Sequence, residues 1–126
     1  MKKPILYCAA CIFSLLAVRN QAEGQSFYDI NTVQSINIVF SQSNWDYMLD
    51  TAYAGSGNYI LAQSVTINGT TFDSVGVKYK GNSTYNANQV KNPFHIELDT
   101  YKDHNYQGYT DIKLSNAAKD PSFIRE

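Results

Sequence analysis

The stretch that decides the fold is Tyr59–Lys80, which reads "YILAQSVTINGTTFDSVGVKYK". Two runs of alternating apolar and polar residues flank the dipeptide Asn68-Gly69 in its centre. Asn-Gly between two such runs is typical of a two-residue type I′ turn, because both residues tolerate the positive φ that this turn requires. The stretch therefore predicts an antiparallel β-hairpin.

The second run of this hairpin has two faces of opposite character. Side chains alternate along a strand, so Val75, Val77 and Tyr79 lie on one face. Lys78 and Lys80 lie on the other face, two residues apart. We expect the apolar face to pack against a core and the basic face to meet solvent, a carboxylate or an anion.

A strand and a helix precede the hairpin. Gln34–Phe40 alternates as a strand does. Ser41 or Ser43 could then cap a helix that ends at Gly55 or Gly57. The predicted inward face of this helix has apolar residues at helical spacing: Trp45, Met48, Leu49 and Ala52.

Two further strands follow the hairpin. Phe94, Ile96 and Leu98 alternate with polar residues, and "DIKLSN" at 111–116 is a second short strand. The order of these elements predicts an α+β fold, a mainly antiparallel sheet with one early helix.

The first 24 residues have the layout of a secretory signal peptide. Lys2 and Lys3 precede the apolar run Ile5–Val18, and a cut before Gln25 would follow small residues. We therefore expect an exported protein, extracellular, at the cell surface or periplasmic, with no membrane span in the mature chain. Two alternatives are a buried N-terminal helix and a lipoprotein anchor on Cys11.

Composition narrows the partners of the mature chain. Both cysteines, Cys8 and Cys11, fall inside the apolar run, so the mature chain would have no disulfide. The net charge of −1 argues against a nucleic-acid-binding protein, which usually has a basic excess.

The loop after the hairpin predicts a phosphate site. Glycine, amide and hydroxyl residues follow the two lysines, and a third lysine stands before the next strand. Lysine charges, a glycine and polar donors can together cradle a phosphate. The residues predicted for this site are Lys78, Lys80, Gly81, Asn82, Ser83 and Lys91. The structural alternative is that Lys78 or Lys80 pairs across strands with Glu97 or Asp99.

Several segments resemble the start of the CotH kinase family, spore coat protein H and its relatives. They are "INIVFSQSNWDYML", "YILAQSVTINGTTFDSVGVKYKGNST", "KNPFHIELD" and "GYTDIKLSNAAKDPSFIRE", in this order. The resemblance covers Ile36 to Glu126. The sequence differs from the family pattern at Lys78, where relatives commonly carry arginine. Lysine keeps the positive charge but cannot form the two parallel hydrogen bonds of a guanidinium group.

The resemblance implies an atypical secreted protein kinase, of which residues 25–126 are the N-terminal part of the domain and form the N-lobe portion of a kinase-like fold. Such an enzyme transfers phosphate from ATP, with Mg²⁺, to protein hydroxyls. In a kinase-like fold, a lysine of the N-lobe binds the nucleotide phosphates and forms an ion pair with a glutamate on a helix. Lys91 is the candidate for this lysine. Glu126 is the candidate glutamate, on a helix that begins at Asp120 and Pro121. The metal-binding aspartates are expected beyond Glu126, so this chain alone is expected to be inactive.

The sequence also has features that bear on functions of other classes. The alternative in another class is a non-catalytic surface or coat module that retains the fold for assembly or adhesion, with surface or coat proteins as partners. A zinc site at His95 and His104 lacks further ligands at metal spacing. Asp99, Asp103 and Asp111 lack a regular calcium-loop pattern, so we predict no metal site in this chain.

Overall fold

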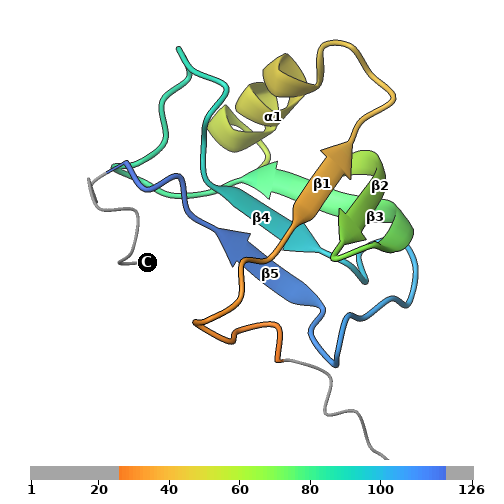
Figure 1. Ribbon diagram of the computed structural model, residues 1–126. Coiled ribbons are helices and arrows are strands. Elements are labelled where there is room, and N and C mark those ends of the chain that lie inside the picture. The colour runs from red at the N-terminus through yellow and green to blue at the C-terminus, as the bar shows by residue number, and fades with distance from the viewer. Residues whose placement is uncertain (1–25, 119–126) are drawn as a thin grey trace, which may run out of the picture.

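The computed structural model describes residues 26–118, which form one antiparallel sheet and one helix (Figure 1). The strands pair in chain order, each with the next, so the sheet is a meander with β1 and β5 at its edges. The elements are β1 (Ile36–Val39), α1 (Trp45–Ala54), β2 (Ile60–Ile67), β3 (Thr70–Tyr79), β4 (Phe94–Glu97) and β5 (Asp111–Leu114). The α+β class with a mainly antiparallel sheet and one early helix is confirmed.

The Asn68-Gly69 turn joins β2 and β3 as predicted. Asn68 has φ 48° and Gly69 has φ 87°, both in the left-handed region that a type I′ turn needs. The two-residue turn places Ile67 opposite Thr70 and sets the register of the whole hairpin. Asn68 also accepts a hydrogen bond from the Ser35 N–H through its side chain, at 2.8 Å, which ties the start of β1 to the turn.

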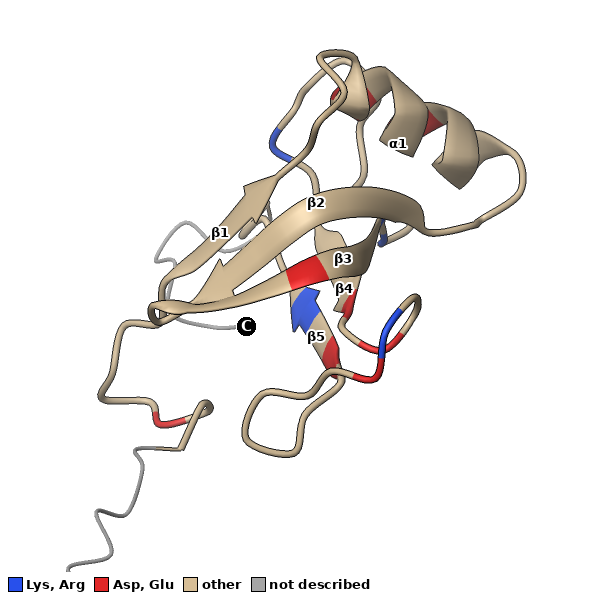
Figure 2. Cartoon of the chain, turned by 90° about the vertical axis from the view of Figure 1, so that its right-hand side faces the viewer, with Lys and Arg blue, Asp and Glu red and all other residues tan. Residues whose placement is uncertain are grey.

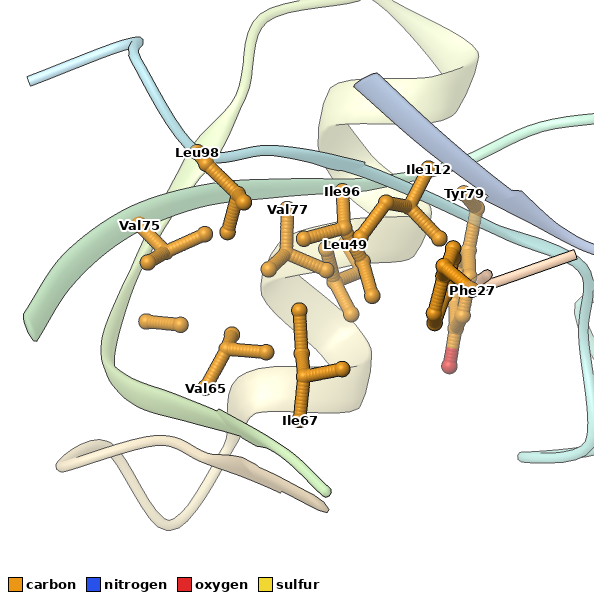
Figure 3. Close-up of a cluster of buried hydrophobic side chains, with 11 residues drawn as sticks. Phe27, Leu49, Val65, Ile67, Val75, Val77, Tyr79, Ile96, Leu98 and Ile112 are labelled. Atoms are coloured by element: carbon orange, nitrogen blue, oxygen red, sulfur yellow. The ribbon is translucent and has the colours of Figure 1, made fainter. Parts of the chain in front are cut away.

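The core lies between the sheet and α1. Leu49 of α1 is fully buried among valines and isoleucines from the strands (Figure 3). The predicted apolar face of β3 is confirmed, because Val75, Val77 and Tyr79 are all buried. The buried cluster consists of Phe27, Leu49, Ala62, Val65, Ile67, Val75, Val77, Tyr79, Ile96, Leu98 and Ile112.

The start of α1 differs from the prediction. Neither Ser41 nor Ser43 caps the helix; Asn44 occupies the N-cap position and makes no side-chain capping bond. The Phe40 and Trp45 rings stack with their centroids 5.3 Å apart, and this contact bridges the turn from strand to helix. Residues 41–44 make the connection, and the first helical residue is Trp45.

Strand lengths also differ from the prediction. The first strand, predicted as Gln34–Phe40, is limited to Ile36–Val39, because its ladder with β2 runs only from Ile36 opposite Ile67 to Val39 opposite Ser64. The helix ends at Gly55, as predicted. These differences move element ends by one or two residues and leave the topology unchanged.

Three predictions fall outside the described residues. They are the signal peptide over 1–24, the helix that begins at Asp120, and the role of Glu126. Within residues 26–118, no helix has both the length and the apolar character that a membrane crossing requires.

Leu49→Ala should lower the free energy of unfolding by about 2–5 kcal/mol, because it leaves a cavity between α1 and the sheet. The matched control is Tyr47→Ala on the same helix, where the side chain is 69% exposed; its effect should be about 0.5 kcal/mol or less. Urea denaturation followed by circular dichroism measures both. Equal losses would contradict the placement of Leu49 at the α1–sheet contact.

Candidate site at the lysine-bearing loop

The loop between β3 and β4 starts with a backbone shape that only glycine adopts easily. Gly81 has φ +91°, in the left-handed region. A Cβ at this position would also collide with the Thr84 side chain and touch Pro93. Lys80, just before it, donates its N–H to the Pro93 carbonyl at 2.9 Å. The two ends of the loop are therefore held together at its base.

Two buried asparagines hold the rest of the loop. Asn92 is 3% exposed; its amide donates to the carbonyls of Asn86 and Gln89, and its oxygen accepts from the Asn86 N–H. Asn116, 7% exposed and just past β5, donates to the carbonyls of Thr84 and Lys91. Together these bonds satisfy backbone groups that the loop cannot satisfy by itself.

The loop also contacts α1 through aromatic rings. The Tyr53 hydroxyl donates to the Gly81 carbonyl at 2.5 Å, and its ring stacks on Tyr85 with centroids 3.7 Å apart. The Tyr85 hydroxyl in turn donates to Asp50 at 2.7 Å. In the adjoining strand, the Tyr79 hydroxyl donates to Asp46 at 2.5 Å, so both aspartates of α1 accept hydrogen bonds from tyrosine hydroxyls.

The pKa values of these phenols show that they stay protonated. Burial raises the pKa of Tyr85 to about 12, and the bond to Asp50 adds to this effect. Burial also raises the pKa of Tyr79 well above its ordinary value, with Asp46 adding to it. Both groups are therefore hydrogen-bond donors at neutral pH, and the side of the loop that meets α1 carries two carboxylates.

The lysines are arranged around this loop in different ways. The Lys78 ammonium lies 4.3 Å from the centroid of the Tyr59 ring and 3.4 Å from the Gly57 carbonyl. Lys91 is exposed, and its carbonyl accepts from Asn116 and Gln89. Among the residues that the structure describes, neither Lys78 nor Lys80 forms an ion pair with a carboxylate. The alternative of a cross-strand pair with Glu97 or Asp99 is therefore not formed.

The remaining predicted residues lie at the exposed start of the loop. Gly81, Asn82 and Ser83 are consecutive and exposed. The fold brings Lys80 next to Gly81 at the end of β3, and the pairing of Lys80 with Pro93 brings Lys91 to the same loop base. The contacts of Lys78 lie instead toward the start of β2.

A second polar cluster covers the outer face of β4 and β5. His95 Nε2 lies 2.5 Å from Asp111 Oδ1, and Lys113 Nζ lies 3.1 Å from Asp111 Oδ2. Tyr59 contacts the His95 ring edge-on, and burial, followed by the charges of Glu97 and Asp111, raises the Tyr59 pKa to about 12. Figure 2 shows acidic and basic residues on β3, β5 and the adjoining loops.

The pKa of Asp111 is lowered overall. Partial burial raises the pKa of this carboxyl, but the hydrogen bond from Lys113 and the charge of His95 outweigh burial. In the residues described, no group of three or more His, Cys, Asp or Glu side chains is arranged to hold a metal ion. The cluster is a set of ion pairs on the sheet surface.

Sequence reasoning missed the residues that shape the loop. The predicted strand at 111–116 includes Asn116, and no role is predicted from the sequence for Asn92, Tyr53 or Tyr85. One sequence signal points to the two asparagines, because only one residue separates each from an apolar strand, where an amide must be either exposed or satisfied.

Comparison with protein-family models, with curated proteins and with solved structures finds no match to this chain.

Asn92→Ala should lower the free energy of unfolding by about 1–3 kcal/mol, because it leaves buried backbone groups of the loop without partners. Hydrogen exchange of the Asn86 amide, which donates to Asn92 at 2.9 Å, should accelerate. Asn88→Ala in the same loop is the control, since the Asn88 side chain is exposed. Unchanged exchange at Asn86 in Asn92→Ala would contradict this account.

Asp111→Asn should flatten the acid dependence of stability. A lowered pKa means that ionised Asp111 stabilises the folded state above its ordinary value of 3.8, and this contribution disappears as pH falls through the lower folded pKa. Since the side chain is 45% exposed, the difference at neutral pH should be below about 1 kcal/mol. Thermal melts from pH 7 down to acid, with Asp103→Asn as control, test it. If the difference in melting temperature between the unsubstituted protein and Asp111→Asn grew as the pH fell, the predicted direction of the effect would be wrong.

Proposed function

We propose that this chain is exported and forms the N-terminal part of an atypical kinase-like domain, whose β3–β4 loop holds nucleotide phosphates. The observation that carries the proposal is the fixed shape of this loop. Gly81 takes a left-handed turn where a side chain would collide, and two buried asparagines hold the segment from Thr84 to Lys91. A polar loop held in one conformation beside lysines is preorganised for an anion.

The charges around the loop limit the direction from which a phosphate approaches. Asp46 and Asp50 lie on the α1 side and would repel an anion there. Lys80 and Lys91 flank the base of the loop, and Gly81, Asn82 and Ser83 are exposed beside them. The ligand therefore approaches the exposed, lysine-bearing side. Lysine acts there as a point charge toward phosphate oxygens.

ATP with Mg²⁺ suits these residues better than a small anion alone. Lys80 and Lys91 come from opposite ends of the loop and can bind different phosphate oxygens of one nucleotide. Mg²⁺ would neutralise charge between the phosphates, with its aspartate ligands supplied beyond Glu126. Lys78, whose contacts are with Tyr59 and Gly57, would add a more distant positive charge.

In the proposed kinase-like domain, the glutamate that forms an ion pair with Lys91 belongs to the segment after β5 rather than to α1. The only acidic residues of α1, Asp46 and Asp50, already accept hydrogen bonds from tyrosines. Helix α1 also precedes β2, whereas Lys91 follows β3. Glu126, on a helix beginning at Asp120, remains the proposed partner of Lys91. Transfer of phosphate to protein hydroxyls is the activity proposed for the whole protein.

A non-catalytic assembly or adhesion module is the second candidate function. The observation that favours it is an apolar groove between β1, β4 and β5, lined in part by Trp45, Phe94 and Leu114. A surface groove lined by apolar side chains can receive an apolar side chain of another protein segment. On this reading the loop would serve as a rigid surface feature, and nucleotide would not bind.

Lys91→Ala in the full-length protein should weaken binding of ATP with Mg²⁺ roughly tenfold or more, because a charge-assisted bond to phosphate contributes about 1.5–3 kcal/mol. Calorimetric titration measures the affinity, and a melting curve shows whether the fold is intact. Lys102→Ala is the matched control, since Lys102 pairs with Asp73 away from this loop.

The outcomes separate the two candidate functions. Unchanged affinity in Lys91→Ala, or no nucleotide binding by the unsubstituted protein, would reject the phosphate site and favour the assembly module. A large loss of stability with no binding defect would assign Lys91 a structural role.

A further inference from the structure

The turn between β2 and β3 contains a dipeptide that is prone to spontaneous chemical modification. Asn68-Gly69 is the only Asn-Gly pair in the sequence. In such a pair the backbone nitrogen of glycine can attack the side-chain carbonyl carbon of asparagine, because glycine has no Cβ to hinder the approach. Both residues are exposed, and a polar pocket of about 340 Å³, lined in part by Asn68, adjoins the turn. Water therefore reaches the reacting groups.

The reaction balances with water as the only co-reactant. The Gly69 nitrogen forms a bond to Asn68 Cγ, the Cγ–Nδ2 bond breaks, and the amide nitrogen leaves as ammonia with the proton from Gly69. Water then opens the resulting succinimide ring at either of its two carbonyl carbons. Opening at Cγ gives aspartate. Opening at the backbone carbonyl carbon gives isoaspartate, in which the main chain runs through Cβ and Cγ of residue 68.

Isoaspartate at this position would disturb the pairing of β2 with β3. The present turn has two residues and places Ile67 opposite Thr70. Isoaspartate inserts a CH₂ group into the main chain of the turn, whose geometry selects the register of the two strands. Since the core face of each strand depends on that register, the modification would damage the core as well as the turn.

Hydrogen bonds to two other segments of the chain hold Asn68 in place. Its N–H donates to the Ser35 carbonyl at 2.9 Å, and its side-chain oxygen accepts from the Ser35 N–H at 2.8 Å. Its Nδ2 donates to Gln34 Oε1 at 2.5 Å and to the Tyr106 hydroxyl at 3.1 Å. Ring closure requires Asn68 Cγ to turn toward the Gly69 nitrogen, and this movement breaks the side-chain bonds.

We propose that Asn68 is a site of spontaneous deamidation that the fold protects, and that its bonds to Gln34, Ser35 and Tyr106 set the rate. Conversion proceeds through molecules in which the turn has opened locally, and each hydrogen bond lowers the population of that open form. The modification converts a reversible opening of the turn into a permanent change of the hairpin. The inference does not depend on nucleotide binding, because it rests on the turn and its hydrogen bonds alone.

Peptide mapping by mass spectrometry tests this in the whole protein at neutral pH, with aspartate and isoaspartate at position 68 separated and quantified. Conversion should be much slower in the folded protein than in the same protein unfolded in urea. Tyr106→Phe and Gln34→Ala should each raise the rate in the folded protein roughly fivefold, since losing one hydrogen bond shifts an opening equilibrium by that factor. Neither substitution should change the rate in urea, where these bonds are broken.

Tyr101→Phe is the matched control for Tyr106→Phe. It removes a tyrosine hydroxyl from the same β4–β5 loop, but that hydroxyl donates to the Tyr59 carbonyl at 3.2 Å, so the rate should stay at the unsubstituted value. Melting curves show which variants fold, and Gln34→Ala serves if Tyr106→Phe does not. Equal rates in the folded and the urea-unfolded protein would overturn the proposal. Unchanged rates in both Tyr106→Phe and Gln34→Ala would overturn it as well.

Discussion

The register fixed by the Asn68-Gly69 turn is the constraint on which the rest of the structure depends. Side chains alternate along a strand, so a slip of one residue between β2 and β3 would move every core residue to the opposite face. The two left-handed residues allow only the tight turn that pairs Ile67 with Thr70. Asn68 extends this control to β1 through its hydrogen bond with Ser35.

The same register separates the apolar and charged faces of the sheet. Val65 and Ile67 of β2 join Val75 and Val77 of β3 in the core, where Leu49 from α1 covers them (Figure 3). Lys78 and His95 are cross-strand partners and therefore share the opposite face. The polar cluster of Tyr59, His95 and Asp111 is thus a consequence of the packing on the other side of the sheet.

Prediction from the sequence succeeded where the signal was local. The hairpin, the buried face of β3 and the existence of a strand from Asp111, which ends at Leu114 rather than at 116, each depend on alternation or turn chemistry within a few residues. The predicted N-cap of α1, Ser41 or Ser43, was wrong, because Asn44 occupies that position. The stacking of Phe40 on Trp45 across the connecting turn is a contact that helix propensity does not encode. Asn116 was missed because its partners, Thr84 and Lys91, lie 32 and 25 residues away. Side-chain bonds over such separations depend on the finished fold.

The charge around the β3–β4 loop follows from the same packing. The Tyr79 ring lies on the buried face of β3, so its hydroxyl needs an acceptor, and Asp46 of α1 supplies one. Tyr85 brings the loop to Asp50 in the same way. The carboxylates of Asp46 and Asp50 therefore accept hydrogen bonds from phenols on one side of the loop. Lys80 and Lys91 lie at the two ends of the loop.

The separation of carboxylates and lysines on opposite sides of the β3–β4 loop bears on both candidate functions. Ordering a loop costs about 1–2 kcal/mol per residue in backbone entropy, and long ordered loops in small domains are usually functional. Hydrogen bonds from Asn92, Asn116 and Tyr53 offset that cost here. An adhesive loop could present either sign of charge, whereas a phosphate site requires its carboxylates to be engaged elsewhere. Because Asp46 and Asp50 accept hydrogen bonds from tyrosines on the α1 side, the negative charge lies on that side, which is compatible with an anion approaching from the lysine-bearing side.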